Sequence, residues 1–101
     1  MQYLIADVGG TNTRVALAHE GVLQIDSIQR YRNADQFGVA EILIDYLHTH
    51  AAGTHPSAVC IDVAGPVGEA QGQLTNLDWT VTTDQLCKVS GAQRGAIIND
   101  M

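Results

Sequence analysis

The chain has 101 residues, of which 46% are hydrophobic and 16% charged, and its formal net charge is −6. This composition is that of a folded domain rather than a disordered chain, and the length allows one domain at most. Only five Lys and Arg residues stand against eleven Asp and Glu, which argues against nucleic acid or an anionic membrane as a partner. The acidic composition does not exclude a nucleotide ligand, because a glycine loop with a divalent cation can hold phosphates without a basic surface.

The cysteines and the N-terminus indicate the compartment. Cys60 and Cys87 are far apart and form no CxxC motif, which favours two reduced, buried thiols over a metal site. No apolar run approaches the ~18 residues of a membrane helix. The N-terminus has the pattern of a strand with an early Asp7, not that of a signal peptide. We therefore expect a cytoplasmic location.

The first part of the chain predicts three strands. Residues 4–8 form a short apolar run, and residues 13–19 form a second one after two glycines. Glu20-Gly21 predicts a tight turn into a third strand, residues 22–32. The apolar face of this third strand would carry Leu23, Ile25 and Tyr31. Two short links between three strands predict an antiparallel meander.

Residues 33–48 predict an amphipathic helix. Asn33, with Gln36 three residues later, has the spacing of a capping box. The apolar stripe would consist of Phe37, Ala40, Leu43, Ile44 and Leu47. Residues 58–64 then form a nearly continuous apolar run, typical of a strand covered on both faces. A strand, a helix and a strand in this order predict a parallel neighbour in the sheet.

The last part of the chain predicts one more helix and one more strand. Residues 65–80 are rich in glycine and predict irregular structure. A second capping box begins at Thr82 and predicts a short helix over residues 82–89, ended by Gly91. Residues 94–99 predict the final strand. The order β-β-β-α-β-α-β predicts a single α/β domain with a mixed, five-stranded sheet.

The end of the first strand and the turn after it have the sequence Asp7-Val8-Gly9-Gly10-Thr11-Asn12-Thr13-Arg14, with two glycines and several polar residues. The segment has neither the GxxxxGK[ST] spacing of a Walker A loop nor the GxGxxG of a dinucleotide fingerprint. It predicts a hairpin turn whose backbone N–H groups approach phosphate oxygens, which a Cβ on either glycine would prevent. The alternative is a plain hairpin that uses Gly-Gly for its turn. The turn residues alone do not distinguish a phosphate-binding loop from a plain hairpin.

The side chains around these glycines favour the phosphate loop. Asp7 can hold Mg²⁺ directly or through water, and Arg14 offers a planar cation to a phosphate. Hydroxyl and amide donors are available from Thr11, Asn12 and Thr13. An intact Asp-x-Gly-Gly-Thr straight after the first strand therefore favours phosphate binding over a plain turn.

A second group of polar residues, Asn99 and Asp100, follows the last predicted strand. The carboxyl ends of strands are where α/β sheets place their ligand crevice. The alternative is a helix cap for the segment that would follow. Together with the glycine loop, Asp100 becomes a candidate general base that faces a bound phosphate. Asp62, inside an apolar strand, is either a hydrogen-bonded structural carboxylate or part of this crevice, and the sequence leaves both open.

These motifs resemble the N-terminal small domain of the bacterial glucokinases, sugar kinases of the actin-like ATPase fold, each half of which is ribonuclease H-like. The matching segments are residues 6–14, 64–67, 75–79 and 97–100. The resemblance covers nearly the whole chain and implies that residues 1–101 are one small domain, with the second domain absent. The chain departs from the family pattern at Ala6, where Gly is usual, and at Met101, where Phe is usual.

The resemblance implies phosphorylation of D-glucose at its 6-hydroxyl by ATP with Mg²⁺, the first step of glycolysis. The implied cofactor-binding residues are Ala6, Asp7, Val8, Gly9, Gly10, Thr11 and Arg14, with Asp7 toward the metal. The implied sugar-binding residues are Gly65, Asn76, Asn99 and Asp100. Asp100 would also be the catalytic base that deprotonates the 6-hydroxyl.

The resemblance also implies that half of the site is missing, because the second domain supplies another phosphate loop and the adenosine pocket. We therefore expect the 101-residue chain to be inactive by itself. The alternative is a non-catalytic sugar-binding or structural module derived from the kinase fold. A separated domain should expose apolar surface, which predicts a homo-oligomer or self-association.

Overall fold

The computed structural model describes residues 2–50, 53, 55–63, 71–73 and 80–99. The strands are β1 (Gln2–Val8), β2 (Asn12–His19), β3 (Val22–Leu23), β4 (Gln29–Arg32), β5 (Ala58–Val63), β6 (Gln71–Gln73), β7 (Thr80–Thr82) and β8 (Arg94–Asn99). The helices are α1 (Val39–Thr49) and α2 (Thr83–Ser90), with short 3-10 turns η1 (Ile25–Ser27) and η2 (Asn33–Asp35).

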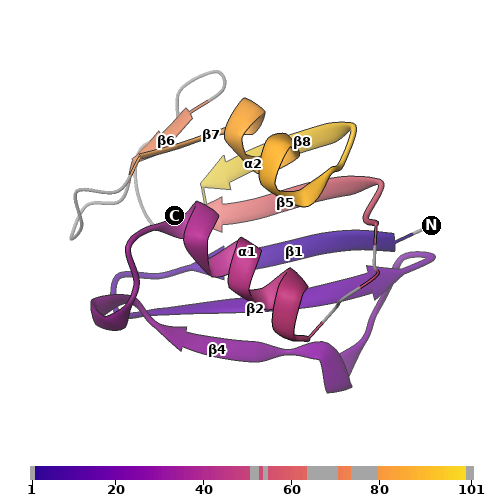
Figure 1. Ribbon diagram of the computed structural model, residues 1–101, viewed down its shortest axis with the longest axis horizontal. Helices are drawn as coiled ribbons and strands as arrows, with labels where there is room; N and C mark the ends of the chain where they lie inside the picture. Colours follow the sequence, from indigo (N-terminus) through magenta and orange to yellow (C-terminus); the bar gives the residue numbers. More distant parts are fainter. Residues whose placement is uncertain (1, 51–52, 54, 64–70, 74–79, 100–101) are drawn as a thin grey trace.

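A mixed sheet in the order β3-β2-β1-β5-β8 organises the domain, and β4 pairs with the other half of β2 (Figure 1). The β1–β2 pair is antiparallel, whereas β1–β5 and β5–β8 are parallel. β3 and β4 pair with different stretches of β2, so the sheet has six strands where five were predicted. The predicted fold class, the meander and the parallel arrangement are confirmed.

The predicted third strand is interrupted, because η1 separates β3 from β4. The Ser27 hydroxyl oxygen accepts a hydrogen bond from the Leu17 N–H (2.9 Å) and so replaces a backbone acceptor on the neighbouring strand. Ile25 is 75% exposed, so the expected common face of Leu23, Ile25 and Tyr31 is wrong. Tyr31 alone of these three is buried.

The first helix begins at Val39 and not at Asn33. Gly38 is its N-cap and offers no side-chain cap, so the predicted capping box is wrong. The expected stripe is also shifted, since Phe37 is 90% exposed and Ile44 is half exposed. The residues that α1 buries are Val39, Ala40, Ile42, Leu43 and Tyr46.

The second helix and the last strand match the prediction. The Thr82 hydroxyl accepts from the Gln85 N–H (3.2 Å) at the start of α2. Gly91 ends the helix in a left-handed conformation (φ 75°), which favours glycine. β8 spans the predicted residues. Irregular structure was expected over residues 65–80, but β6 and β7 form a two-stranded antiparallel sheet there.

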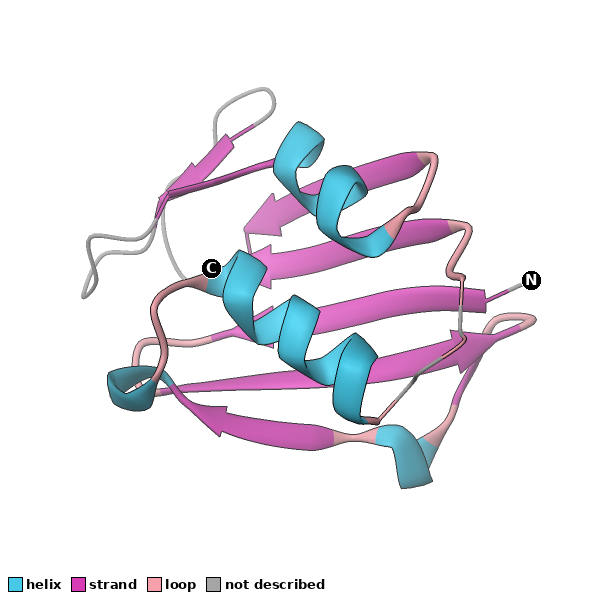
Figure 2. Ribbon diagram, in the orientation of Figure 1, coloured by secondary structure: helices cyan, strands magenta, loops and turns pink. Residues whose placement is uncertain are grey.

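The two helices cover the same face of the main sheet (Figure 2). Residues of β5 alternate between buried and half-buried, so within the described residues the expected cover on both faces is wrong. We call the other side the open face. By strand register it carries Tyr3, Ile5, Asp7, Arg14, Ala16, Ala18, Ala58, Cys60, Asp62, Arg94, Ala96 and Ile98. In the described part of the chain, neither helix is long and apolar enough to cross a membrane.

Candidate functional site

The carboxyl ends of three parallel strands meet at one edge of the sheet. Val8, Val63 and Asn99 are aligned in register at the ends of β1, β5 and β8. Because neighbouring strands are about 4.8 Å apart, the backbone of Asn99 lies about 10 Å from that of Val8. The predicted phosphate loop and the predicted sugar segment therefore start from the same edge. Asp100, Gly65 and Asn76 lie outside the described residues.

The loop between β1 and β2 is a tight hairpin. The Gly9 N–H donates a hydrogen bond to the Asn12 carbonyl oxygen (2.9 Å). A Cβ placed on Gly9 would lie only 3.1 Å from this oxygen. Close backbone approach within the loop itself therefore favours glycine at this position.

Asn33 holds this loop in place from η2. Its Nδ2 donates to the Gly9 carbonyl (2.8 Å), its Oδ1 accepts from the Thr13 hydroxyl (2.7 Å), and its own N–H donates to the Thr11 carbonyl (2.9 Å). Asn33 is 2% exposed and Thr13 is fully buried. The Thr13 hydroxyl thus points inward to Asn33, which corrects the expectation that it is offered to a ligand.

A hollow of about 340 Å³ opens beside the loop. It is lined by Asp7, Gly9, Thr11, Asn12, Arg14 and Arg30. The structure thus brings four of the predicted cofactor-binding residues together with Asn12, and Gly10 lies in the same loop. The side chains of Ala6 (1% exposed) and Val8 (0%) belong to the core, so these two residues can reach a ligand only through their backbone.

Asp7 and Arg14 face each other across the antiparallel β1–β2 pair. Arg14 Nη2 donates to Asp7 Oδ2 at 2.9 Å, and the two side chains are 59% and 40% exposed. Asp62 lies beside Asp7 in register on β5. Burial, and then the charge of Asp62, raises the pKa of the Cys60 thiol on the same face.

These residues fit a magnesium ion held mainly by a ligand's phosphates. Within the described residues, no three His, Cys, Asp or Glu side chains gather into a metal cluster. Mg²⁺ is usually bound through one or two carboxylates plus substrate phosphates and water, so such a cluster is not required. The Asp7 carboxylate is exposed at the hollow, and one of its oxygens is bonded to Arg14. Asp7 can therefore serve a metal through its other oxygen or through water.

Two residues of the site were missed by the sequence prediction. Asn33 was assigned to a helix cap, and nothing in the local sequence indicates its contacts with residues 20 and 24 positions earlier. Arg30 belonged to a strand predicted only as a sheet edge. Its pairing with Arg14 across β2 and β4 brings it to the hollow. The concentration of arginines in residues 14–32 was the one available indication.

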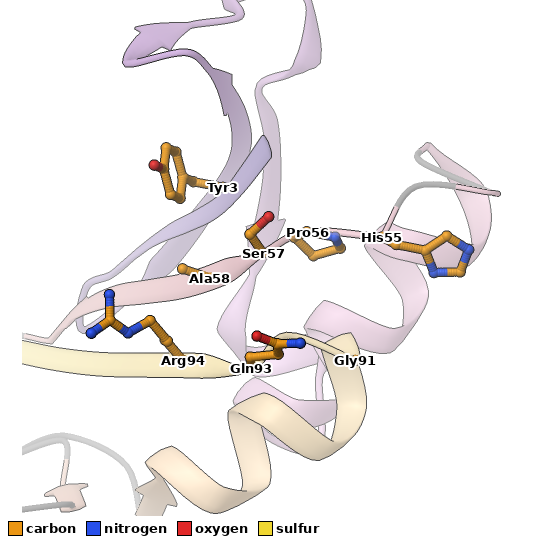
Figure 3. Close-up of a pocket in the computed structure, with 8 residues that line it drawn as sticks. All are labelled: Tyr3, His55, Pro56, Ser57, Ala58, Gly91, Gln93 and Arg94. Atoms are coloured by element: carbon orange, nitrogen blue, oxygen red, sulfur yellow. The ribbon is translucent and has the colours of Figure 1, made fainter. Parts of the chain in front are cut away.

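A larger hollow, of about 620 Å³, lies at the opposite, amino-terminal ends of the same strands (Figure 3). Its lining comprises Tyr3, His55, Pro56, Ser57, Ala58, Gly91, Gln93 and Arg94. The His55 ring points away from Tyr3 and Arg94 (Figure 3). None of the predicted site residues lines it. Its larger volume therefore does not make it the predicted phosphate site.

Comparisons with known proteins show the family of this chain. The family model for glucokinase matches residues 4–101. A glucokinase of Caulobacter vibrioides is 35% identical over 99 residues, which are 96% of this chain and 30% of that protein. A glucokinase structure from an Antarctic psychrotroph superposes with a TM-score of 0.82 at 29% identity, covering 98% of this chain and 32% of the other.

A more distant structure, a glucokinase from Balamuthia mandrillaris in complex with glucose, gives a TM-score of 0.69 at 18% identity and shows the fold alone. The match spans 98% of this chain and 29% of that protein. The chain thus spans about 30% of the curated relatives that it matches. The family model covers almost the entire chain, and the chain shares the actin-like ATPase fold with these sugar kinases. The chain therefore belongs to the glucokinase family, as an N-terminal part.

Proposed function

We propose that this chain forms the N-terminal half of a glucokinase site, in which ATP phosphorylates D-glucose at its 6-hydroxyl. One observation carries the proposal. The glycine loop, held by Asn33 and flanked by Asp7 and Arg14, lies at the same sheet edge where β8 ends at Asn99, the residue before Asp100 in the sequence. A relative of the same fold has been crystallised with glucose, which agrees with the proposed substrate.

Phosphoryl transfer requires mainly positioning and neutralisation of charge. The N–H groups of residues 9–11 and the Arg14 guanidinium would bind phosphate oxygens, and Asp7 would hold Mg²⁺, which neutralises phosphate charge when bound. Asp100 would accept the proton of the 6-hydroxyl. Asn99, Gly65 and Asn76 would bind the other hydroxyls of the sugar.

The Asp100→Ala variant tests the catalytic assignment in the longest product of the gene that carries this chain. A positioned base contributes about 10²–10⁴ in rate, so kcat for glucose 6-phosphate formation should fall by about this factor. The Kd for glucose should change less. Asp26→Ala removes an exposed carboxylate on η1 and is the matched control. Turnover close to the unmodified enzyme in Asp100→Ala would refute the assignment.

The proposal places residues 1–101 in one domain of a two-domain kinase, because the chain spans about 30% of its relatives. Contacts to one side of ATP should not suffice for turnover, so the 101-residue chain by itself is expected to be inactive. The alternative is a non-catalytic sugar-binding or structural module. Glucose binding without turnover in the longest gene product would favour this alternative.

We also propose that the chain self-associates through the open face and acts in the cytoplasm. Ile5 and Ile98 are 36% and 50% exposed on this face, which leaves two large apolar side chains available to a second copy of the chain. Both cysteines are free, which agrees with a reducing compartment, and both are half-buried rather than buried as expected. Light scattering from micromolar to millimolar concentration measures the association, and a monomer throughout this range would contradict it.

A further inference from the structure

Three of the five Lys and Arg residues of the chain lie close to the glycine loop. Arg14 is on β2, and Arg30 and Arg32 are on β4. The register pairs Arg14 with Arg30 and Asn12 with Arg32. Residues that are directly opposite in a sheet point to the same face, so the three guanidinium groups share the face on which Asp7 lies. The net charge of the chain is −6, so these three arginines form a positively charged patch on an otherwise acidic domain.

The Arg14–Arg30 pair costs stability in the absence of a ligand, because like charges directly opposite each other in a sheet repel. Arg14 is compensated by its bond to Asp7 at 2.9 Å. Among the described residues, no carboxylate lies within ion-pair distance of Arg30. Arg30 nevertheless lines the hollow beside Gly9 and Thr11, whereas Arg32 does not. Both cations of the pair therefore line the hollow, and Arg30 is the one without a compensating carboxylate among the described residues.

We propose that Arg30 is a second phosphate-binding side chain of this site, which acts with Arg14 on the terminal phosphates of the phosphoryl donor. The inference rests on the proposed function and adds a phosphate-binding residue to it. An arginine binds a phosphate through two parallel N–H···O bonds, and such an anion would relieve the repulsion between the two guanidinium groups. The paired cations select a ligand with several negative charges, such as a triphosphate, over a monophosphate.

Ligand binding and stability of the fold are two different roles for Arg30, and one variant distinguishes them. If Arg30 is present for binding, its replacement by a neutral residue should weaken anion binding and leave the ligand-free chain at least as stable as before. If Arg30 is present for packing, the replacement should lower the Tm. The two outcomes have opposite signs for the same variant.

The test compares Arg30→Gln with Arg32→Gln, which removes a charge two residues further along the same face of the same strand. Inorganic tripolyphosphate is the probe, titrated calorimetrically into the 101-residue chain at constant ionic strength. In Arg30→Gln the Kd should rise about 5- to 10-fold, a typical loss for one exposed charge-assisted contact. In Arg32→Gln the Kd should change less than about twofold. Arg30→Lys retains the charge but not the fork, and should lie between.

Two further measurements complete the test. The Tm of ligand-free Arg30→Gln should equal or exceed that of the unmodified chain, and tripolyphosphate should raise the Tm of the unmodified chain more than that of the variant. In the longest gene product, Arg30→Gln should raise KM for ATP while KM for glucose stays unchanged.

Three results would overturn the inference. Equal weakening by Arg30→Gln and Arg32→Gln would show general attraction of anions rather than a contact. A lower Tm in Arg30→Gln with unchanged Kd would assign the residue to the fold. Absence of tripolyphosphate binding in the unmodified chain would remove the site. The proposed function is judged separately, by glucose 6-phosphate formation and its loss in Asp100→Ala.

Discussion

The covered and the open face of the sheet differ in what their side chains do, although the same strands supply both. On β1, Leu4 and Val8 are fully buried under the helices, whereas Ile5 and Asp7 between them are partly exposed on the other side. Period-two alternation thus interleaves core residues with site residues. Neighbours in the sequence should therefore tolerate substitution very differently.

Leu4→Ala and Ile5→Ala give the largest expected difference. Leu4 is fully buried in the core, so its truncation should lower the free energy of unfolding by about 2–5 kcal/mol. Ile5 is 36% exposed, and its truncation should cost less than about 1 kcal/mol. Urea denaturation measures both. Equal losses would show that the open face is as well covered in solution as the helix-covered face.

Alkaline pH tests the covered face through Tyr31. Burial, and then the charge of Asp45, raises the pKa of Tyr31 to about 12 from its ordinary value of 10. Because the folded state favours the protonated phenol, the associated stability is complete below pH 10. It is lost between pH 10 and about 12, when the unfolded chain ionises first, by about 2–3 kcal/mol in total.

Denaturation of the unmodified chain and of Tyr31→Phe across this pH range checks the assignment. The phenylalanine variant should show a smaller alkaline loss. The same loss in both proteins would mean that another group titrates.

Asn33→Ala tests the link between the core and the site, because the buried Asn33 amide joins the loop to β2. Loss of these hydrogen bonds should lower the free energy of unfolding by about 1–3 kcal/mol. Amide exchange of Gly9 should also become faster, since its loop is no longer held. Asn33→Asp keeps the acceptor for Thr13 but sets a buried carboxylate against the Gly9 carbonyl oxygen, and should cost at least as much as Asn33→Ala. Unchanged exchange at Gly9 would contradict this role of Asn33.

Ile98→Ser should have the smallest effect on stability, less than about 0.5 kcal/mol, because the side chain is half exposed on the open face. It should nevertheless shift the chain toward the monomer in light scattering. Phe37→Ser is the control, since Phe37 is 90% exposed but lies outside the sheet. If Phe37→Ser disperses the oligomer and Ile98→Ser does not, the open face is not the interface.

The correct and incorrect predictions differ in the range of the interactions involved. Thr82 and Gly91 define α2 through contacts within one turn, and such local chemistry is readable from a sequence. Asn33-x-x-Gln36 has an equally good local pattern for a cap. The Asn33 amide instead bonds to Gly9 and Thr13, far away in the sequence, and the helix begins later. Ser27 likewise interrupts a predicted strand through its bond to Leu17.

Residue type and spacing along the chain were sufficient to predict the order of the main strands and helices, the glycine loop with its acidic neighbour and the resemblance to the glucokinases, but not β6, β7 or the break between β3 and β4. The tertiary structure decided which face of the sheet is covered, that Asn33 holds the loop and that Arg30 faces Arg14 beside it. These facts depend on how β4 pairs with β2, and the register of two strands separated by an irregular turn follows from the packing of the whole sheet.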